Sequence, residues 1–123
     1  MLVWVVFLIF QFFYYKIMNF EIRDEYKLKE LMPTKSHLKN MAEFFYAFSD
    51  NTRLKIIILL SIKPLCVSEI TKVLEINQTT ISHQLKILKS LNIVSCDRVG
   101  KNIIYYIKNS SIEEVLNASV ECI

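Results

Sequence analysis

The sequence predicts a mainly α-helical fold with one β-hairpin, arranged as a winged helix-turn-helix. Apolar residues recur at helical spacing through much of the stretch from residue 19 to residue 91. Within it, a short helical segment and a longer one are joined by a tight connection, and two β-rich runs follow. The chain's one glycine, Gly100, lies between these runs. Because a hairpin directly after a helix-turn-helix makes a winged helix, we expect one such domain over residues 18–123.

The first three helices of this domain are expected over residues 19–32, 37–48 and 52–62. Pro33 separates the first two, and Ser49 and Asp50 offer side-chain oxygens to cap the third. The second helix carries an apolar stripe: Leu38, Met41, Phe44, Phe45 and Phe48. The third helix is expected to bury Leu54, Ile57, Ile58, Leu59 and Leu60. Pro64 lies just beyond its end.

The later elements follow the same logic. A short helix is expected over residues 67–74 and a longer one over residues 78–91, with Asn77 as the cap of the second. That second helix has an apolar stripe of Ile81, Leu85, Leu88 and Leu91. Strands are expected over residues 93–98 and 102–107, joined by a turn at residues 99–101, and a last helix over residues 112–122.

Residues 1–17 form a separate apolar segment in which only Gln11 and Lys16 are polar. A spanning helix needs about 20 apolar residues, and the segment lacks the basic start and small-residue cleavage site of a signal peptide. Three interpretations stay open: sequence upstream of a true start at Met18, a short membrane anchor, or a hydrophobic arm that packs in a dimer. We favour the first and do not expect a membrane partner.

Charge and composition narrow the function classes. The net charge is only +3, but residues 77–108 carry five basic side chains and one acidic side chain, which favours a polyanion as partner. A single glycine argues against a phosphate-binding loop. We find no set of nucleophile, base and acid, and therefore expect no enzyme. Three scattered cysteines without a CxxC pair are typical of a reducing compartment, and we expect the cytoplasm.

The helix over residues 78–91 has an opposite face without any acidic residue. Short polar side chains near a helix N-terminus can hydrogen-bond to base edges in the major groove. Basic side chains there and on the hairpin would contact phosphates, which supply affinity with little sequence information. We therefore expect double-stranded DNA as the partner and these residues as its contacts: Gln78, Thr79, Thr80, Ser82, His83, Lys86, Arg98 and Lys101.

Residues 38–108 resemble the ArsR/SmtB family of winged-helix repressors. The resemblance is carried by the runs DNTRLKII and ISHQLKILK, together with AEFF, LCVSEI and GKNIIYY, in the family's order and spacing. It implies a homodimer built from the first and last helices of the domain. It also implies a repressor that binds a short inverted repeat and leaves when an inducer binds, with bases contacted by Gln78, Thr79, Ser82 and His83.

The inducer is less well defined by the resemblance. Family members often hold a soft metal with a Cys-Val-Cys run, but this chain has Cys66-Val67-Ser68. Cys66, Glu69 and His37 are weak candidate ligands for a metal ion such as zinc, which needs about four ligands. The family's other metal site, on the last helix, looks absent, because Asn109, Ser111 and Cys122 occupy the corresponding positions.

Cys66 has two further interpretations. It lies at the start of a helix, where the dipole makes a thiol reactive, so it could sense oxidants or electrophiles. It could equally be a small buried hydrophobic residue.

Two other functions compete with that of a DNA-binding repressor. One is a winged helix that serves protein–protein contact, and the other is a membrane-tethered regulator.

Overall fold

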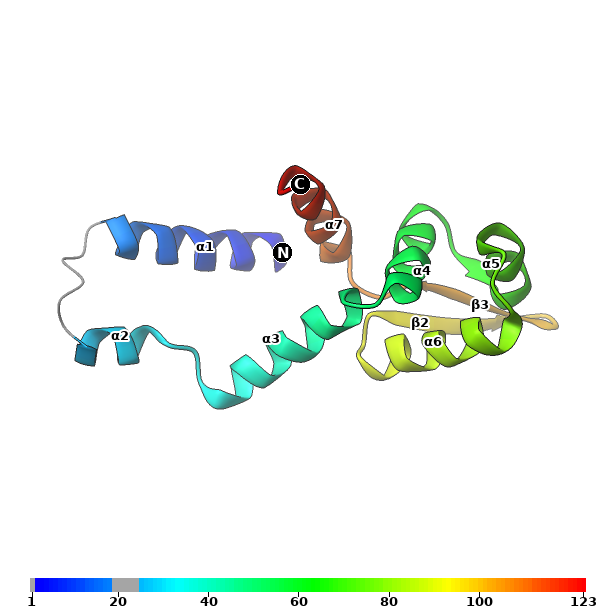
Figure 1. The fold of residues 1–123 in the computed structure, drawn as a ribbon, viewed down its shortest axis with the longest axis horizontal. Helices are drawn as coiled ribbons and strands as arrows, with labels where there is room; N and C mark the ends of the chain where they lie inside the picture. Colours follow the sequence, from blue (N-terminus) through cyan, green and yellow to red (C-terminus); the bar gives the residue numbers. More distant parts are fainter. Residues whose placement is uncertain (1, 19–24) are drawn as a thin grey trace. The chain divides into compact units, whose positions relative to one another are not determined.

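The computed structural model describes residues 2–18 and 25–123, and the chain divides into two compact units, Met1–Lys39 and Asn40–Ile123. Figure 1 shows the succession of elements along the chain. The helix-turn-helix and the hairpin belong to the second unit. The expected helix over residues 19–32 is seen as α2, Glu25–Leu31, and its first six residues lie outside the described part.

The first unit contains α1, Leu2–Met18, and α2. The helix α1 is apolar on every side, and its large hydrophobic side chains from Leu2 to Ile17 are exposed. Among the residues that the structure describes, no helix is both long enough and apolar enough to cross a bilayer.

The second unit is built from four further helices and most of α3. The helix α3 spans Lys35–Phe48 and therefore begins in the first unit. The others are α4 (Asn51–Ile62), α5 (Val67–Leu74), α6 (Gln78–Ser90) and α7 (Ser111–Glu121). These bounds lie within two residues of those expected from the sequence. Because α5 and α6 are joined by three residues, they form the predicted helix-turn-helix.

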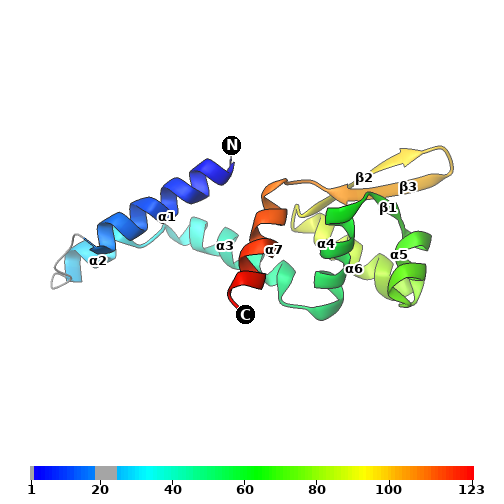
Figure 2. The same ribbon diagram turned by 90° about the horizontal axis from the view of Figure 1, so that it is seen from above.

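A three-stranded antiparallel sheet lies along α4, α5 and α6, as Figure 2 shows. The strands β2 (Val94–Val99) and β3 (Asn102–Ile107) form the predicted hairpin, with Val99 opposite Asn102 at its end. The strand β1, Leu65–Cys66, adds to the other edge of β3, with Leu65 opposite Tyr105. This third strand was not predicted, because two residues carry no alternation pattern by themselves.

The core of the second unit lies between the helices and the sheet. It consists of Ala47, Ile56, Ile57, Leu60, Leu65, Ile70, Ile81, Leu85, Leu88, Ile93, Val94 and Ile112. The stripe expected for α4 was partly wrong: Ile58 is exposed, whereas Ile56 is fully buried. The buried side of α4 runs through Arg53, Ile56, Ile57 and Leu60, so an arginine occupies one of its core positions.

The apolar stripe of α3 is also less buried than a core helix would require. Leu38, Met41 and Phe45 are exposed, and Phe44 and Phe48 are half-buried against the core. Only Ala47, near the end of the helix, is fully buried. The stripe therefore has the i, i+3, i+4 spacing of a packing face, and three of its members are uncovered in the single chain.

Caps and turns fix the connections of the domain. The Asp50 carboxylate accepts a hydrogen bond from the Arg53 N–H at 3.0 Å and caps α4, as predicted. Left-handed backbone occurs at Glu75 (φ 55°), at Asn92 (φ 59°) and at Gly100 (φ 64°). Glycine suits this conformation at the hairpin turn because it has no Cβ.

Candidate nucleic-acid interface

The helix α6 is held with one side in the core and the other exposed. The Asn77 side-chain oxygen accepts a hydrogen bond from the Thr80 N–H at 2.8 Å, which confirms the predicted cap. Ile81, Leu85 and Leu88 are fully buried, as their spacing predicts. The helix packs against α5 and α4, so the helix-turn-helix fixes its orientation in the domain.

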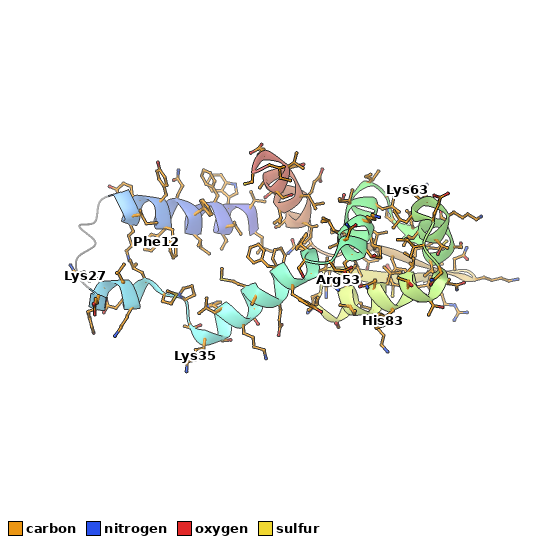
Figure 3. All side chains as sticks on the ribbon, in the orientation of Figure 1. Phe12, Lys27, Lys35, Arg53, Lys63 and His83 are labelled. Atoms are coloured by element: carbon orange, nitrogen blue, oxygen red, sulfur yellow. The ribbon has the colours of Figure 1, made fainter. Side chains whose placement is uncertain are left out.

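The opposite side of α6 presents most of the predicted DNA contacts together. The side chains exposed there are Gln78, Thr79, Ser82, His83 and Lys86. Thr80 is half-buried, and the Asn77 cap uses its backbone N–H. The side chains are short hydrogen-bonding groups near the N-terminus of the helix, followed by a lysine, and α6 contains no carboxylate. His83 is labelled on this helix in Figure 3.

The hairpin of β2 and β3 is the wing of the domain. The predicted contacts Arg98 and Lys101 are both exposed on it. The Arg98 Nε donates a hydrogen bond to the Gly100 carbonyl oxygen at 3.3 Å, so the guanidinium lies beside the turn. Val99 and Ile103 are exposed next to it. The wing therefore ends in two cations with apolar neighbours.

A contact between Lys89 and Cys96 joins α6 to the wing. The Lys89 Nζ lies 3.2 Å from the Cys96 Sγ on β2. This hydrogen bond, together with the attraction between the two groups, raises the pKa of Lys89 above its ordinary value. The end of α6 and the start of the wing are thereby tied to each other by side chains, a contact that the sequence does not signal.

Cys66 and Glu69 lie together at the start of α5. The Glu69 Oε1 accepts a hydrogen bond from the Cys66 N–H at 3.2 Å, and the Cys66 Sγ lies 3.1 Å from the Ser68 Oγ. Hydrogen bonds from the Cys66 thiol and N–H lower the pKa of Glu69. The thiol itself is buried.

Two of the three weak candidate ligands, Cys66 and Glu69, belong to the second unit and lie together, and the third, His37, belongs to the first unit. Within residues 2–18 and 25–123, no three His, Cys, Asp or Glu side chains gather closely enough to hold a metal ion. His37 lies 3.2 Å from the Thr34 hydroxyl at the start of α3. Ser68 places a hydroxyl, and not a second thiolate, beside Cys66. These residues fall short of the four ligands that zinc requires.

Sequence reasoning missed Arg53 and Gln84. Arg53 is 5% exposed, and its guanidinium donates hydrogen bonds to the Tyr46 and Ala47 carbonyl oxygens and to the Gln84 side chain of α6. The one available signal was spacing. Arg53 precedes Ile56, Ile57 and Leu60 by three, four and seven residues, which is the spacing of a core position.

The fold and the exposed, acid-free helix define the class of protein: a winged helix-turn-helix regulator. Residues 50–95 match the family model described as bacterial regulatory protein, arsR family. The chain is 36% identical over 82 residues to the cadmium resistance transcriptional regulatory protein CadC of Listeria innocua, covering 69% of that protein. The chain therefore belongs to the ArsR family of bacterial regulatory proteins.

Other known proteins agree with this assignment. The chain is 35% identical over 74 residues to a transcriptional repressor SmtB homolog of Synechocystis, covering 60% of this chain and 56% of that protein. It also resembles a homodimeric winged helix-turn-helix DNA-binding domain of Mycobacterium bovis, described as a possible ArsR-family regulator. That likeness has a TM-score of 0.66 at 23% identity, covers 84% of this chain and 89% of the domain, and supports the fold.

Proposed function

We propose that this protein is a homodimeric repressor that binds an inverted-repeat operator through α6 and leaves it when an inducer acts. In this proposal Gln78, Thr79, Ser82 and His83 contact base edges in the major groove, and Thr80 contributes beside them. Lys86, Arg98 and Lys101 contact phosphates. In this proposal the protein is a regulator and not an enzyme, and it works in the cytoplasm.

The observation that carries the proposal is the exposed face of α6. These short polar side chains are exposed on one side of α6. On the opposite side of the helix, Ile81, Leu85 and Leu88 are fully buried. A rigid helix presenting donors and acceptors without a carboxylate fits the major groove, where each base pair displays a distinct pattern of such groups. A solvated surface helix would more commonly mix both signs of charge.

The dimer in the proposal is supported by the uncovered stripe of α3. Met41 and Phe45 are exposed on one side of this helix, and Val120 is exposed on α7. Buried against a second copy, they would remove apolar surface from water and stabilise the pair. In such a dimer bound to DNA, the two α6 helices would lie about one helical turn of DNA apart, roughly 34 Å, or a multiple of that distance.

Release by an inducer is the least specified part of the proposal. The zinc chemistry of the family does not fit Cys66, Ser68 and Glu69, so we assign no step to a metal. The thiol of Cys66 is the candidate sensor. It lies at the N-terminus of α5, the first helix of the helix-turn-helix, so its modification would disturb the packing of α5 on α6.

The experiment is fluorescence anisotropy of the full chain on DNA upstream of its own gene, titrated across salt concentrations. We expect specific binding with a Kd of about 10⁻⁸ to 10⁻¹¹ M, weakening steeply as salt rises. The double variant Ser82→Ala with His83→Ala should bind only non-specifically, at about 10⁻⁴ to 10⁻⁶ M. Both side chains are exposed, so the variant keeps its core.

The chain offers a matched control. Ser36 and His37 are an adjacent, exposed Ser-His pair on α3, and replacing both by alanine removes the same groups elsewhere. The control should retain operator binding. Unchanged specific affinity in the Ser82–His83 variant would contradict the assignment of α6. If the unaltered chain shows no specific DNA binding there or on any selected duplex, a protein–protein module becomes the better account.

The same titration identifies the inducer. Zn(II), arsenite and a mild thiol oxidant are added in turn to the bound complex. Release by the oxidant, lost in Cys66→Ser, supports the thiol sensor. Indifference to all three contradicts the sensor role and leaves the DNA-binding proposal intact.

A further inference from the structure

The guanidinium of Arg53 is the meeting point of three helices. It belongs to the first turn of α4, and it is almost fully buried. Its Nη2 donates a hydrogen bond to the Tyr46 carbonyl oxygen at 2.9 Å, and its Nε donates one to the Ala47 carbonyl oxygen at 3.2 Å. Its Nη1 donates one to the Gln84 Oε1 at 3.4 Å. Burying a cation is costly unless its N–H groups are hydrogen-bonded, and these three hydrogen bonds reduce the cost of burying the Arg53 guanidinium.

Two of these acceptors close the end of α3. Tyr46 and Ala47 lie in its last turn, where carbonyl groups have no partner within the helix. The negative end of the helix dipole also favours a cation there. The Tyr46 ring adds a cation–π contact, with its centroid 4.6 Å from the Arg53 Cζ. Arg53, labelled in Figure 3, therefore fastens the end of α3 to the start of α4.

The third acceptor belongs to the helix that faces DNA. Gln84 is half-buried on α6 and directly follows His83. Its side chain points toward the domain interior, while Ser82 and His83 are exposed. One arginine thus connects the end of α3, the helix with the uncovered apolar stripe, to the middle of α6.

We propose that Arg53 and Gln84 are positioning residues that set the distance between the two α6 helices of the dimer. This inference rests on the proposed function, in which α3 pairs two copies and α6 contacts DNA. If α3 is fixed in the dimer, the link from α3 through Arg53 to Gln84 fixes each α6 relative to the two-fold axis. A rigid link makes the protein selective for one spacing between half-sites, and a loosened link makes it tolerant of several.

The test measures spacing discrimination. An operator is selected from random duplexes with the full chain, and single base pairs are then added or removed between its half-sites. Each base pair shifts one half-site by about 3.4 Å along the helix axis. Discrimination is the ratio of the Kd on the altered operator to the Kd on the selected one. A purely stabilising contact would change both Kd values alike and leave this ratio unchanged.

Gln84→Met removes the acceptor and keeps a side chain of similar length that favours helix. We expect the ratio to fall by about three- to tenfold, the range that follows from losing one hydrogen bond of ordinary net strength. Gln84→Glu keeps an acceptor for Arg53 and should retain the ratio while weakening both affinities. The matched control is Gln11→Met, at an exposed position on α1 outside the proposed DNA contacts, which should leave both affinities and their ratio unchanged.

A second variant secures the assignment to Arg53. Arg53→Lys removes the guanidinium that donates a hydrogen bond to Gln84. In that background, Gln84→Met should have no further effect on the ratio. Urea unfolding confirms that each variant is folded at the assay temperature. A full effect of Gln84→Met in that background would show that Gln84 acts without Arg53 and overturn the proposal.

The outcomes distinguish a failure of the proposed function from a failure of the role given to Arg53 and Gln84. Absence of specific binding by the unaltered chain overturns the proposed function, and this inference with it. Specific binding by the unaltered chain, with the same spacing ratio in Gln84→Met, overturns this inference alone. A reduced ratio in Gln84→Met and a retained ratio in Gln84→Glu support it.

Discussion

At the residue scale, Glu69 shows how one carboxylate holds the start of a helix. It accepts the Cys66 N–H at 3.2 Å, and the Cys66 thiol and N–H lower its pKa from the usual 4.5. A carboxyl group whose pKa is lower in the folded state than in the unfolded state stabilises the fold at pH values at which it is ionised in both states. Its contribution is therefore complete above pH 4.5 and is lost as the pH falls through the lowered value.

We therefore expect Glu69→Ala to lower the free energy of unfolding at neutral pH. The difference from the unaltered chain should shrink as the pH falls below 4.5. Urea denaturation at several pH values measures both quantities. Glu30→Ala on α2, an exposed carboxylate outside this contact, is the control. A deficit in Glu69→Ala that does not change between neutral and acidic pH would contradict the contact.

Glu75 gives a prediction of opposite sign. It ends α5 in the left-handed conformation at φ 55°, where a Cβ costs about 1 kcal/mol. Glu75→Gly should therefore raise the free energy of unfolding by about 0.5 to 1 kcal/mol, even though glycine increases unfolded-state entropy. The matched control is Glu114→Gly in the first turn of α7, where the backbone is already helical, and this change should lower the free energy of unfolding. Equal destabilisation by both, measured in urea, would rule out strain at Glu75.

At the element scale, the wing would contribute mainly affinity for DNA in the proposed complex, and α6 would contribute sequence specificity. Lys101 lies at the wing turn and is exposed, so in the proposed complex it contacts phosphate. Lys101→Ala should weaken binding to all sequences alike and reduce the slope of log K against log salt by about 0.9. Lys55→Ala, which removes the same charge from an exposed position on α4, should leave that slope nearly unchanged. If the salt slopes of the two variants are equal, the wing does not contact DNA as proposed.

The elements differ in how well the sequence predicts them. The bounds of α5 and β3 agree with expectation residue for residue. Pro64 lies shortly before α5 and the turn at Gly100 lies shortly before β3, and a break in the apolar or β-rich pattern marks the other end of each element. The strand β1 was missed, because Leu65 and Cys66 form a strand only by pairing with β3, some forty residues later. Local pattern cannot show a pairing that distant.

The candidate site divides in the same way. The exposed face of α6 follows directly from its periodicity, so Ser82 and His83 could be placed from the sequence. Arg53 was missed despite its core spacing, because charged residues are normally expected outside and because its acceptors include backbone carbonyls of another helix. The same holds for Lys89, whose partner Cys96 lies on β2.

At the scale of the whole molecule, the apolar stripe of α3 predicts how two copies pair. Met41→Asp places a charge in the proposed interface and should shift the protein from dimer to monomer in sedimentation equilibrium. The fold should persist, because Met41 is exposed in the single chain. Val73→Asp, at an exposed apolar position on α5, is the control and should remain dimeric. A dimer that survives Met41→Asp unchanged would place the interface elsewhere.

Dimerisation and DNA recognition together make the central claim, that α6 of each copy binds one half of an inverted repeat. Selection of bound sequences from a random pool of duplex DNA, with the full chain, tests it most directly. The account predicts enrichment of an inverted repeat. The centres of its half-sites should lie about one helical turn apart, or a whole-number multiple of one turn. A pool that remains random after repeated rounds, or one that enriches only a single unrepeated site, would contradict it.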